Sequence, residues 1–376
     1  MELARKGFRV LYVETLGLRR VTFNARDLAR IRRRLVKGIR AVRRVQDRIW
    51  VYSPLVIPAH GLEIVKRINR SILKGYLHLI TRWLGFRSPI IWTYNPLVLD
   101  MLPGLRAAML VYHCVDSLAS APGMPGESLR KAEISLLSDA DVVFTTSPEL
   151  QRRCAGAVQE RSHYFPNVAD FDHFSIARQP GPIPEELATI PSPRIGFVGA
   201  ISSYKVDFEL VAEVARRRPE WNWVMIGQVG EGEPSTDLHK LKLPNIRVLG
   251  PRKYADLPLY LRGFDVCVLP CTMNDYTKAM FPMKFFEYLS AGKPVVASRL
   301  DALAEYAQAC FFADSAGEFI HAVEEVLAGN LPDQSLCLEL ARSNTWDRRT
   351  EEMTQVLRRS WRAKAHAHRS LVEGSG

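Results

Sequence analysis

The strongest constraint on the fold is an alternation of short apolar strand-like runs with helical runs, which continues along the whole chain. In the first half the strand-like runs are 9–15, 48–54, 89–96, 108–116, 141–147 and 162–165. The helical runs between them are 24–45, 61–84, 127–138 and 148–156. Short buried strands separated by helices predict βαβ units, and therefore a largely parallel sheet.

The pattern then restarts after a proline-rich stretch that runs from 166 to 193. Further strands are predicted at 194–200, 222–228, 245–250, 266–271, 294–298 and 310–313, and helices at 207–218, 254–263, 283–291, 316–328, 333–343 and 346–365. We therefore expect an α/β protein of two doubly wound, Rossmann-like domains facing each other across a cleft. The predicted boundaries are 1–166, a linker at 167–193, a second domain at 194–345, and a final helix and tail at 346–376.

Length and composition agree with this organisation. The chain has 376 residues, which suits two domains, and 47% of them are hydrophobic, which is enough for two cores. No apolar run reaches the roughly 18 residues of a membrane span, and the first residues do not read as a signal peptide. The six cysteines are scattered among apolar residues, so we expect reduced core cysteines and no metal site.

The charge is concentrated in the first half. The net charge of the chain is +11, but residues 1–166 hold 27 Lys+Arg against 13 Asp+Glu, while the remainder holds 24 against 27. The excess is densest in residues 1–48, with 15 basic residues against 4 acidic ones. A surface of this kind suits nucleic acid, anionic lipid or a phosphorylated acceptor. Because no nucleic-acid-binding motif is present, we do not expect a nucleic-acid partner.

The run 61–84 is the predicted helix with the clearest amphipathic pattern. Its apolar residues recur at helical spacing and its basic residues lie mostly elsewhere around the helix. A basic amphipathic helix with Trp and Tyr is typical of a membrane-surface helix. The alternative is a domain helix with its apolar side in the core and a solvated basic side. The basic cluster at 30–44 favours attraction to anionic lipid.

The stretch "YTKAMFPMKFFEYLSAGKPVV" (276–296) places Lys284 and Glu287 on adjacent turns of one helix. Pro282 favours the start of that helix, and Gly292 with the following Lys-Pro ends it. A lysine at a helix N-terminus suits a phosphate, and a glutamate one turn later can accept hydrogen bonds from two ribose hydroxyls. The simpler alternative is a surface ion pair three residues apart, which is common on helices.

The segment 282–298, "PMKFFEYLSAGKPVVAS", resembles the donor-site signature of GT-B glycosyltransferases, P-x-K-x-x-E-Y-L-A-A-G-K-P-V-V. Three further segments also resemble that family. They are "GFVGAISSYK" (196–205) at the glycine turn of the second domain, "FPNVADFDHF" (165–174) at the domain junction, and "NTWDRRTEEM" (344–353) at the start of the terminal helix. The resemblance covers essentially the whole chain and is strongest in 194–300.

The resemblance implies a site for a nucleotide sugar in the second domain. Glu287 would bind the ribose hydroxyls, and the segment 249–261 would lie beside the base. The implied diphosphate contacts are Lys284, Lys205 and backbone N–H groups near Gly199 and Met283. Tyr276 and Asp275 are candidates for contact with the donor sugar. No cofactor or metal is expected, since lysines and helix ends can neutralise the leaving diphosphate.

Two positions depart from the common retaining members of the family. Ala279 stands where they carry a second glutamate, and Ala200 where they usually carry an arginine. The Met283–Lys284 pair and the missing glutamate make the chain more similar to the inverting glucuronosyltransferase of xanthan assembly and its relatives. The segments 92–96, 112–117 and 199–210 resemble bacterial polysaccharide transferases of the teichuronic-acid type. Asp116, at the end of a strand, is the candidate general base for an inverting transfer, with His113 as the second candidate. If the enzyme retains configuration, Asp116 would position the acceptor; if it is structural, it would cap the following turn.

The resemblance therefore implies a glycosyltransferase, with a UDP-sugar as the expected donor and a saccharide or polyprenyl-linked saccharide as acceptor, in cell-surface or exopolysaccharide synthesis. We expect a cytoplasmic protein that is peripheral on the anionic inner face of a bacterial membrane. Two alternatives remain open. One is a non-catalytic sugar-nucleotide-binding protein, which Ala279 favours, and the other is an NDP-sugar epimerase of the same architecture.

Overall fold

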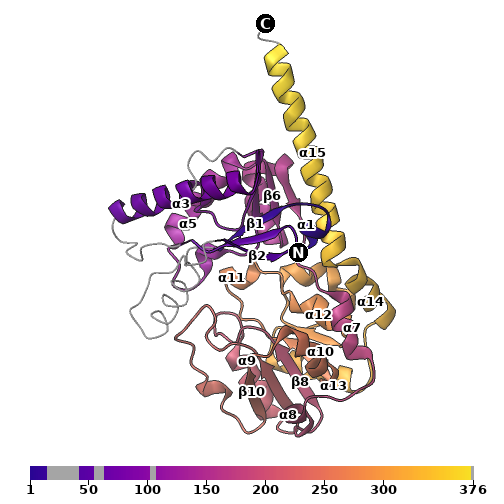
Figure 1. Ribbon diagram of the computed structural model, residues 1–376. Helices are drawn as coiled ribbons and strands as arrows, with labels where there is room; N and C mark the ends of the chain where they lie inside the picture. The colour runs from indigo at the N-terminus through magenta and orange to yellow at the C-terminus, as the bar shows by residue number, and fades with distance from the viewer. Residues whose placement is uncertain (15–41, 55–62, 102–106, 374–376) are drawn as a thin grey trace. The chain divides into compact units, whose positions relative to one another are not determined.

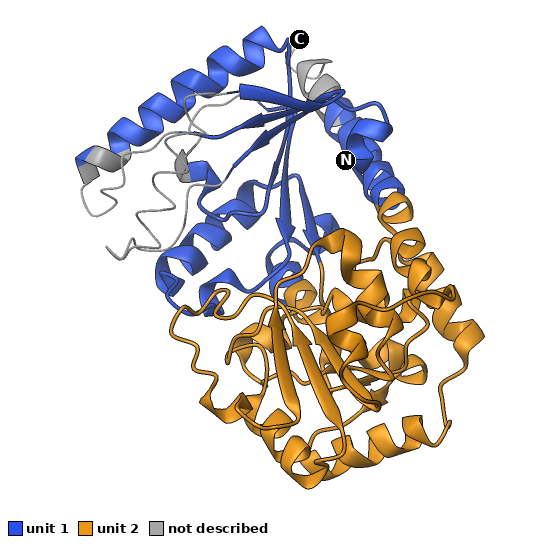
Figure 2. Cartoon of the chain, turned by 60° about the horizontal axis from the view of Figure 1, so that its bottom comes forward, with its two compact units in different colours: residues 1–145, 153–163, 350–376 blue, residues 146–152, 164–349 orange. Residues whose placement is uncertain are grey.

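The computed structural model describes residues 1–14, 42–54, 63–101 and 107–373 (Figure 1). The chain divides into two compact units, each of which is α/β. Unit 1 is built from residues 1–145, 153–163 and 350–376, and unit 2 from residues 146–152 and 164–349 (Figure 2). Most of the basic cluster at 30–44 lies outside the described residues.

Unit 1 contains two sheets, with strand orders β1-β3-β2 and β4-β5-β6-β7. Their strands are β1 (Val10–Val13), β2 (Val42–Gln46), β3 (Ile49–Tyr52), β4 (Ile90–Thr93), β5 (Met109–Cys114), β6 (Val142–Thr145) and β7 (Ser162–Tyr164). β1 pairs in parallel with β3, and β5 pairs in parallel with both β4 and β6. The strand-like runs of the first half therefore correspond to strands.

The strand β2 corrects one expectation, because its residues fall in the run 24–45 that the sequence predicts as a helix. β2 instead pairs antiparallel with β3, so this sheet is mixed. The two-residue connection Asp47–Arg48 makes the hairpin, with Arg48 at φ 59°. The basic composition obscured a strand whose pairing places Val42 opposite Tyr52. The rest of the predicted helix lies outside the described residues.

In the described part of unit 1 the helices are α1 (Glu2–Arg5), α3 (Glu63–Trp83), α4 (Val98–Met101) and α5 (Gly126–Asp139), and α6 (Pro148–Val158) is shared between the units. The helix α3 contributes to a small core that also contains Tyr52 of β3. Its buried residues are Leu73, Leu77, Ile80 and, just beyond its end, Leu84. Their spacing of three and four residues places them on one face of the helix.

Unit 2 is built on one parallel six-stranded sheet with the order β10-β9-β8-β11-β12-β13. The strands are β8 (Arg194–Val198), β9 (Asn222–Ile226), β10 (Ile246–Gly250), β11 (Val266–Leu269), β12 (Val295–Ala297) and β13 (Phe311–Phe312). Counted along the chain this order is 3-2-1-4-5-6, the doubly wound Rossmann arrangement. The strand order reverses between β8 and β11, and ligands bind such sheets at the carboxyl ends of those strands.

Helices cover both faces of this sheet. They are α8 (Glu185–Ala188), α9 (Phe208–Arg217), α10 (Leu257–Arg262), α11 (Asp275–Lys278), α12 (Lys284–Ser290), α13 (Ala316–Leu327) and α14 (Gln334–Ser343). Residues of α9 and α13 fill one core, and residues of α10, α12 and α14 fill the other. Because both faces are covered, β11 is buried at every position, which explains why its sequence is a continuous apolar run.

The proline-rich segment between the two predicted domains contains short helices. It contains α7 (Phe171–Ser175) as well as α8. Asp170 caps α7, because its side chain accepts a hydrogen bond of 3.1 Å from the backbone N–H of His173. The buried ring of Phe174 belongs to the same core as α12. This packing positions α7 beside the predicted signature helix.

The terminal helix α15 (Trp346–Glu373) begins in unit 2, and from Thr350 its residues belong to unit 1. Met353, Val356 and Leu357 are buried. In unit 1, Lys364 forms an ion pair of 2.7 Å with Asp141, and Glu351 forms one of 3.0 Å with Lys6. The predicted return of the terminal helix to the first domain is therefore confirmed.

Three observations concern both units. Among the described residues, no helix combines the length and the apolar character that a membrane crossing requires. All six cysteines are buried and carry free thiols. Within the same described part of the chain, no group of three or more His, Cys, Asp or Glu side chains has the arrangement of a metal site.

Candidate functional site

The candidate site in unit 2 begins at the turn after β8, which contains Gly199. The backbone N–H of Gly199 donates to the carbonyl of Ile226 at 2.9 Å. A Cβ at Gly227 would lie 1.7 Å from the carbonyl oxygen of Gly199, so the turns after β8 and β9 approach each other more closely than a side chain permits. Glycine at both positions therefore allows the two turns to pack closely at this part of the carboxyl edge.

The close approach of these two turns leads to a prediction about the stability of unit 2. Gly227→Ala should destabilise unit 2 by about 3 kcal/mol, because the added methyl group overlaps backbone that cannot rotate away. Urea denaturation followed by circular dichroism measures the change. The matched control is Gly156→Ala in α6, where nothing lies within 4 Å and alanine should be neutral or stabilising. Equal stability of the two variants would contradict the close approach.

Most of the signature segment serves to hold α12 in place. The hydroxyl of the buried Tyr288 accepts a hydrogen bond of 2.8 Å from the backbone N–H of Val198 at the end of β8. Gly292 ends the helix with φ 68°, a conformation that favours glycine. Lys293 donates through Nζ to the carbonyls of Arg262 at 2.9 Å and Phe264 at 2.7 Å. These contacts fix α12 beside the glycine turn and beside the next strand.

Lys284 and Glu287 are the two residues of α12 that are candidates for contact with a ligand. Lys284 Nζ and Glu287 Oε2 are 2.6 Å apart. The simpler alternative, an ordinary surface pair, does not describe them, because Glu287 is only 3% exposed. Burial raises the pKa of the Glu287 carboxyl, and the nearby Lys284 ammonium lowers that pKa without cancelling the effect of burial. The helix therefore holds a carboxylate in surroundings that disfavour its charge.

Two aromatic residues close to Glu287 were not identified from the sequence. His173 of α7 and Tyr254 stack with ring centroids 4.5 Å apart and an interplanar angle of 14°. His173 Nε2 also lies 2.9 Å from the backbone carbonyl of Tyr254. Burial and the Glu287 carboxylate raise the pKa of Tyr254. Both residues fall within segments that the resemblance had singled out, 165–174 and 249–261, but only their packing shows that they share one site.

Lys205 lies in the loop after Gly199, where two tyrosine rings flank it. Its Nζ is 5.4 Å from the ring centroid of Tyr204 and 5.5 Å from that of Tyr276. No carboxylate among the described residues forms an ion pair with this ammonium. Asn274, which caps α11, donates to the carbonyl of Tyr204 at 2.7 Å and so connects the two loops. The structure thus brings Lys205 and Tyr276 together.

The remaining donor-site candidates lie just before α12. Met283 is the residue before the helix and has an exposed side chain. Ala279 is fully buried, and its carbonyl accepts a hydrogen bond of 2.8 Å from Ser147 Oγ. Asp275 is the first residue of α11. A glutamate at position 279 would be buried in the present arrangement, so the difference from the common retaining members lies in packing as well as in charge.

The two candidates for catalysis lie in unit 1, after and within β5. Asp116 follows the strand by two residues, and its backbone carbonyl accepts from the N–H of Leu118 at 2.9 Å. The N-cap of the next short helix is Ser117 and that of α5 is Pro125, so Asp116 is the N-cap of neither. His113 packs against the rings of Trp92, Tyr94 and Phe144, with centroids 5.1–5.9 Å away. This environment favours the interpretation of His113 as a packed core histidine.

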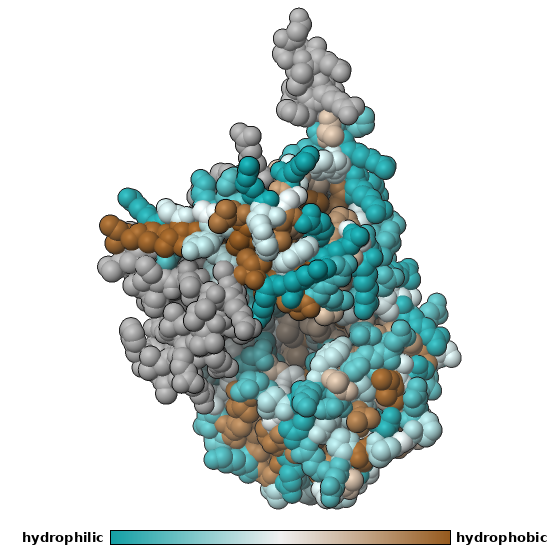
Figure 3. Space-filling view, in the orientation of Figure 1, coloured by the Kyte–Doolittle hydropathy of each residue, from teal (hydrophilic) through white to brown (hydrophobic). Residues whose placement is uncertain are grey.

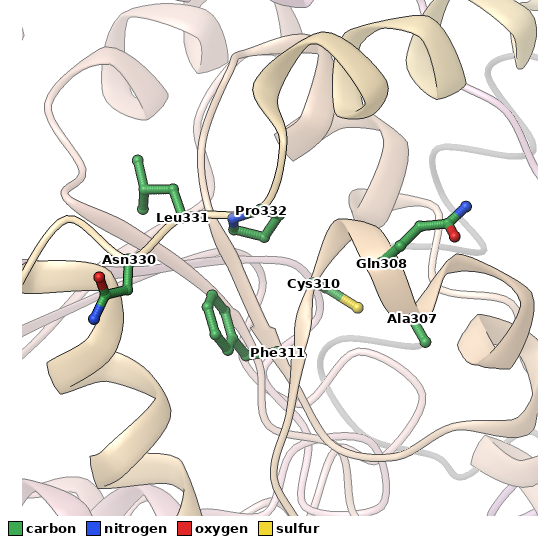
Figure 4. A pocket seen from close by; sticks show the side chains of 7 residues that line it. All are labelled: Ala307, Gln308, Cys310, Phe311, Asn330, Leu331 and Pro332. Atoms are coloured by element: carbon green, nitrogen blue, oxygen red, sulfur yellow. The ribbon is translucent and has the colours of Figure 1, made fainter.

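One cavity of about 520 Å³ occurs elsewhere in unit 2 (Figure 4). It is lined by Ala307, Gln308, Cys310, Phe311, Asn330, Leu331 and Pro332. None of these residues is a predicted site residue, and no titratable side chain except the buried thiol of Cys310 lines the cavity. It therefore adds nothing to the site at the carboxyl edge of the sheet.

The comparisons with known proteins agree with this geometry. Residues 192–329 match the family described as glycosyl transferases group 1. A protein of Bacillus subtilis (strain 168) named as the teichuronic acid biosynthesis glycosyltransferase TuaH is 28% identical over 257 residues. That match covers 63% of this chain and 64% of the relative, which is less than two thirds of its length.

Two solved structures share the fold at low identity. The sucrose-phosphate synthase of Thermosynechococcus elongatus is 16% identical with a TM-score of 0.68, over 96% of this chain and 91% of that one. HepE of Anabaena in complex with UDP-glucose is 16% identical with a TM-score of 0.63, over 93% and 98%. The chain thus shares the GT-B fold of these structures. Within that fold, residues 192–329 are the part that matches the glycosyl transferases group 1 family.

Proposed function

We propose that the protein transfers a sugar from a nucleoside diphosphate to the hydroxyl of a saccharide or of a lipid-linked saccharide. The observation that carries this proposal is the buried Glu287 carboxylate, paired with Lys284 beside the glycine turn of a Rossmann-type sheet. A carboxylate with a raised pKa is costly to the folded protein, and such perturbed groups gather at functional sites. Two ribose hydroxyls would satisfy it.

The same site offers contacts for the rest of a nucleotide. Lys205 and Lys284 supply positive charge for the diphosphate, and the backbone N–H groups near Gly199 and Met283 supply donors without added charge. The stacked pair of His173 and Tyr254 lies beside Glu287 and would contact the base or ribose. The lysines would also stabilise the charge that develops on the leaving diphosphate, so we propose a metal-independent transfer.

The transfer itself needs a hydroxyl nucleophile. In an inverting reaction Asp116 takes the proton of the acceptor hydroxyl as its oxygen bonds to the anomeric carbon, while the bond from that carbon to the diphosphate breaks. In a retaining reaction Asp116 would orient the acceptor instead. The alternative function is a sugar-nucleotide-binding protein without catalysis, and the buried Ala279 at the place of the second glutamate is the observation that favours it.

The printed descriptions of similar proteins support a choice of donor and pathway. HepE is described in complex with UDP-glucose, and TuaH is named for teichuronic acid biosynthesis. We propose a UDP-sugar as donor and the assembly of a bacterial surface polysaccharide as the process. The acceptor would then be found at the inner face of the cell membrane, with the enzyme bound there as a peripheral protein.

Calorimetric titration tests this proposal directly. UDP, GDP, ADP and their common sugar conjugates are titrated into the wild-type protein and into Lys284→Ala. We expect selective binding of a uridine nucleotide and a loss of affinity on the order of tenfold in the variant, because a charge-assisted contact to phosphate is removed. Arg216→Ala, on the outer side of α9, is the control and should bind normally. Absence of binding by every nucleotide would count against the proposal.

A further inference from the structure

The helix α3 has two separate apolar faces, of which only one is in the core. The sequence alone groups all its apolar residues into one pattern. In the structure the buried face consists of Leu73, Leu77, Ile80 and Leu84. A second set, here called the exposed stripe, lies in solvent: Ile64, Ile68, Ile72, Tyr76, Leu79 and Trp83. Figure 3 shows hydrophobic residues gathered along this helix at the upper left.

The exposed stripe is too far around the helix to be the margin of the core. At about 100° per residue its centre lies roughly 120° from the centre of the buried face. Its members are also strongly exposed, with Trp83 at 72%, Ile64 at 67% and Leu79 at 63%. From Ile64 to Trp83 the stripe extends for roughly 28 Å. Isolated exposed apolar residues are normal on protein surfaces, whereas a continuous row of this length indicates a docking surface.

The remaining arc of α3 is basic. Arg67, Lys74 and Arg82 are exposed and lie on the side of the helix away from the buried face, next to the exposed stripe. Residues 64–99 contain no Asp or Glu, while residues 64–87 contain six Lys and Arg. The helix therefore has three sectors, one packed on the sheet, one apolar and exposed, and one cationic.

We infer that α3 is the membrane-binding element of the protein, and that it lies along an anionic bilayer with the exposed stripe directed toward the acyl chains. A bilayer with anionic headgroups is the one occupant that offers an apolar layer and a negative layer side by side along the whole stripe. Tyr76 and Trp83 suit the boundary between those layers. The exposed stripe would be the surface by which the protein binds the membrane as a peripheral protein. The inference rests on the proposed function only where it connects this surface to an acceptor at the membrane.

Flotation with lipid vesicles tests the inference on the full chain. The vesicles contain phosphatidylcholine alone or phosphatidylcholine mixed with phosphatidylglycerol. We expect the wild type to bind the mixed vesicles. The double variant Leu79→Ser/Trp83→Ser should bind them on the order of a hundredfold more weakly, because two large apolar side chains no longer leave water. The triple variant Arg67→Gln/Lys74→Gln/Arg82→Gln should lose the preference for anionic lipid.

The matched control is Ile134→Ser in α5, a single apolar residue that is 68% exposed outside the stripe, and it should bind vesicles as the wild type does. Unchanged binding by the double variant would overturn the inference. A lower melting temperature or an altered oligomeric state of the double variant without vesicles would also overturn the inference. Either result would show that the exposed stripe is covered by another part of the chain or by a second copy of it. UDP titration of the same variants separates the two proposals: loss of vesicle binding with normal UDP binding supports this one alone.

Discussion

Asp116→Asn is expected to leave nucleotide binding unchanged and to reduce the rate of sugar transfer on the order of a thousandfold. Asparagine keeps the size of the side chain but cannot accept the acceptor proton, and general-base catalysis contributes about that factor. Calorimetric binding of UDP and the turnover of the UDP-sugar with its acceptor measure the two quantities separately. A fall in kcat with an unchanged nucleotide Kd is the expected result.

The control for this prediction is Asp139→Asn, an exposed aspartate at the end of α5, which should keep normal turnover. Near-normal turnover of Asp116→Asn would remove Asp116 from the role of base. A second variant, His113→Phe, then decides about the other candidate. Because His113 packs among aromatic rings, phenylalanine should be tolerated if the histidine is a core residue, and turnover should survive.

Glu287→Gln is expected to weaken nucleotide binding on the order of a hundredfold while leaving the free protein as stable as the wild type or more stable. The loss of affinity follows because hydrogen bonds from ribose hydroxyls to a buried carboxylate are strong, and an amide accepts fewer of them. The gain in stability follows because burial raises the pKa of this carboxyl even with Lys284 beside it. UDP titration and thermal unfolding without ligand measure the two effects.

The sign of this stability effect depends on pH in a defined way. A carboxyl whose pKa is raised by folding stabilises the folded protein at low pH. This contribution is lost as the pH rises from the ordinary glutamate pKa of about 4.3 through the raised pKa of the folded state. The stability advantage of Glu287→Gln over the wild type should therefore be absent at the acid end of the range. It should grow with rising pH and become constant once the pH exceeds the raised pKa.

Glu186→Gln provides the matched control with the opposite sign. Hydrogen bonds from Arg252 and Tyr260 lower the pKa of Glu186, so its contribution is present at neutral pH and decreases as pH falls through the lowered value. That variant should lose a little stability at neutral pH, and only a little, because the pair is partly exposed. If Glu287→Gln behaved like Glu186→Gln, the Lys284–Glu287 pair would be a structural ion pair.

The sequence predicted most of the strands and most of the helices correctly, and the reason is physical. In unit 2 both faces of the sheet are covered, so strands such as β11 are continuous apolar runs that stand out from the helices. In unit 1 the prediction failed at β2, whose residues are mostly exposed and whose two arginines follow a strongly basic segment, so that the strand did not stand out. Its identity as a strand depends on pairing with β3 across a two-residue turn, which local composition does not encode.

The site was predictable where a motif contained it. Lys284, Glu287 and Lys205 lie in short segments that resemble a known motif. In the structure, Tyr288, Gly292 and Lys293 of the same motif hold α12 in place. The stacking of His173 on Tyr254 beside Glu287 was not predictable, because it joins residues 81 positions apart in the chain. The same limit applied to α3, where only packing separates the buried apolar face from the exposed stripe.

The terminal helix α15 has a consequence for how the protein is made. Unit 1 contains the first residues of the chain, yet its last segment is residues 350–376. Because domains fold as units during synthesis, from the N-terminus onward, unit 2 can be completed on the ribosome while unit 1 still lacks this helix. The contacts of Lys364 with Asp141 and of Glu351 with Lys6 then form only after unit 2 has been synthesised. Unit 1 is thus completed only after unit 2 has been synthesised, so a chain that ended before residue 350 would lack part of unit 1 although all the earlier residues of that unit were present.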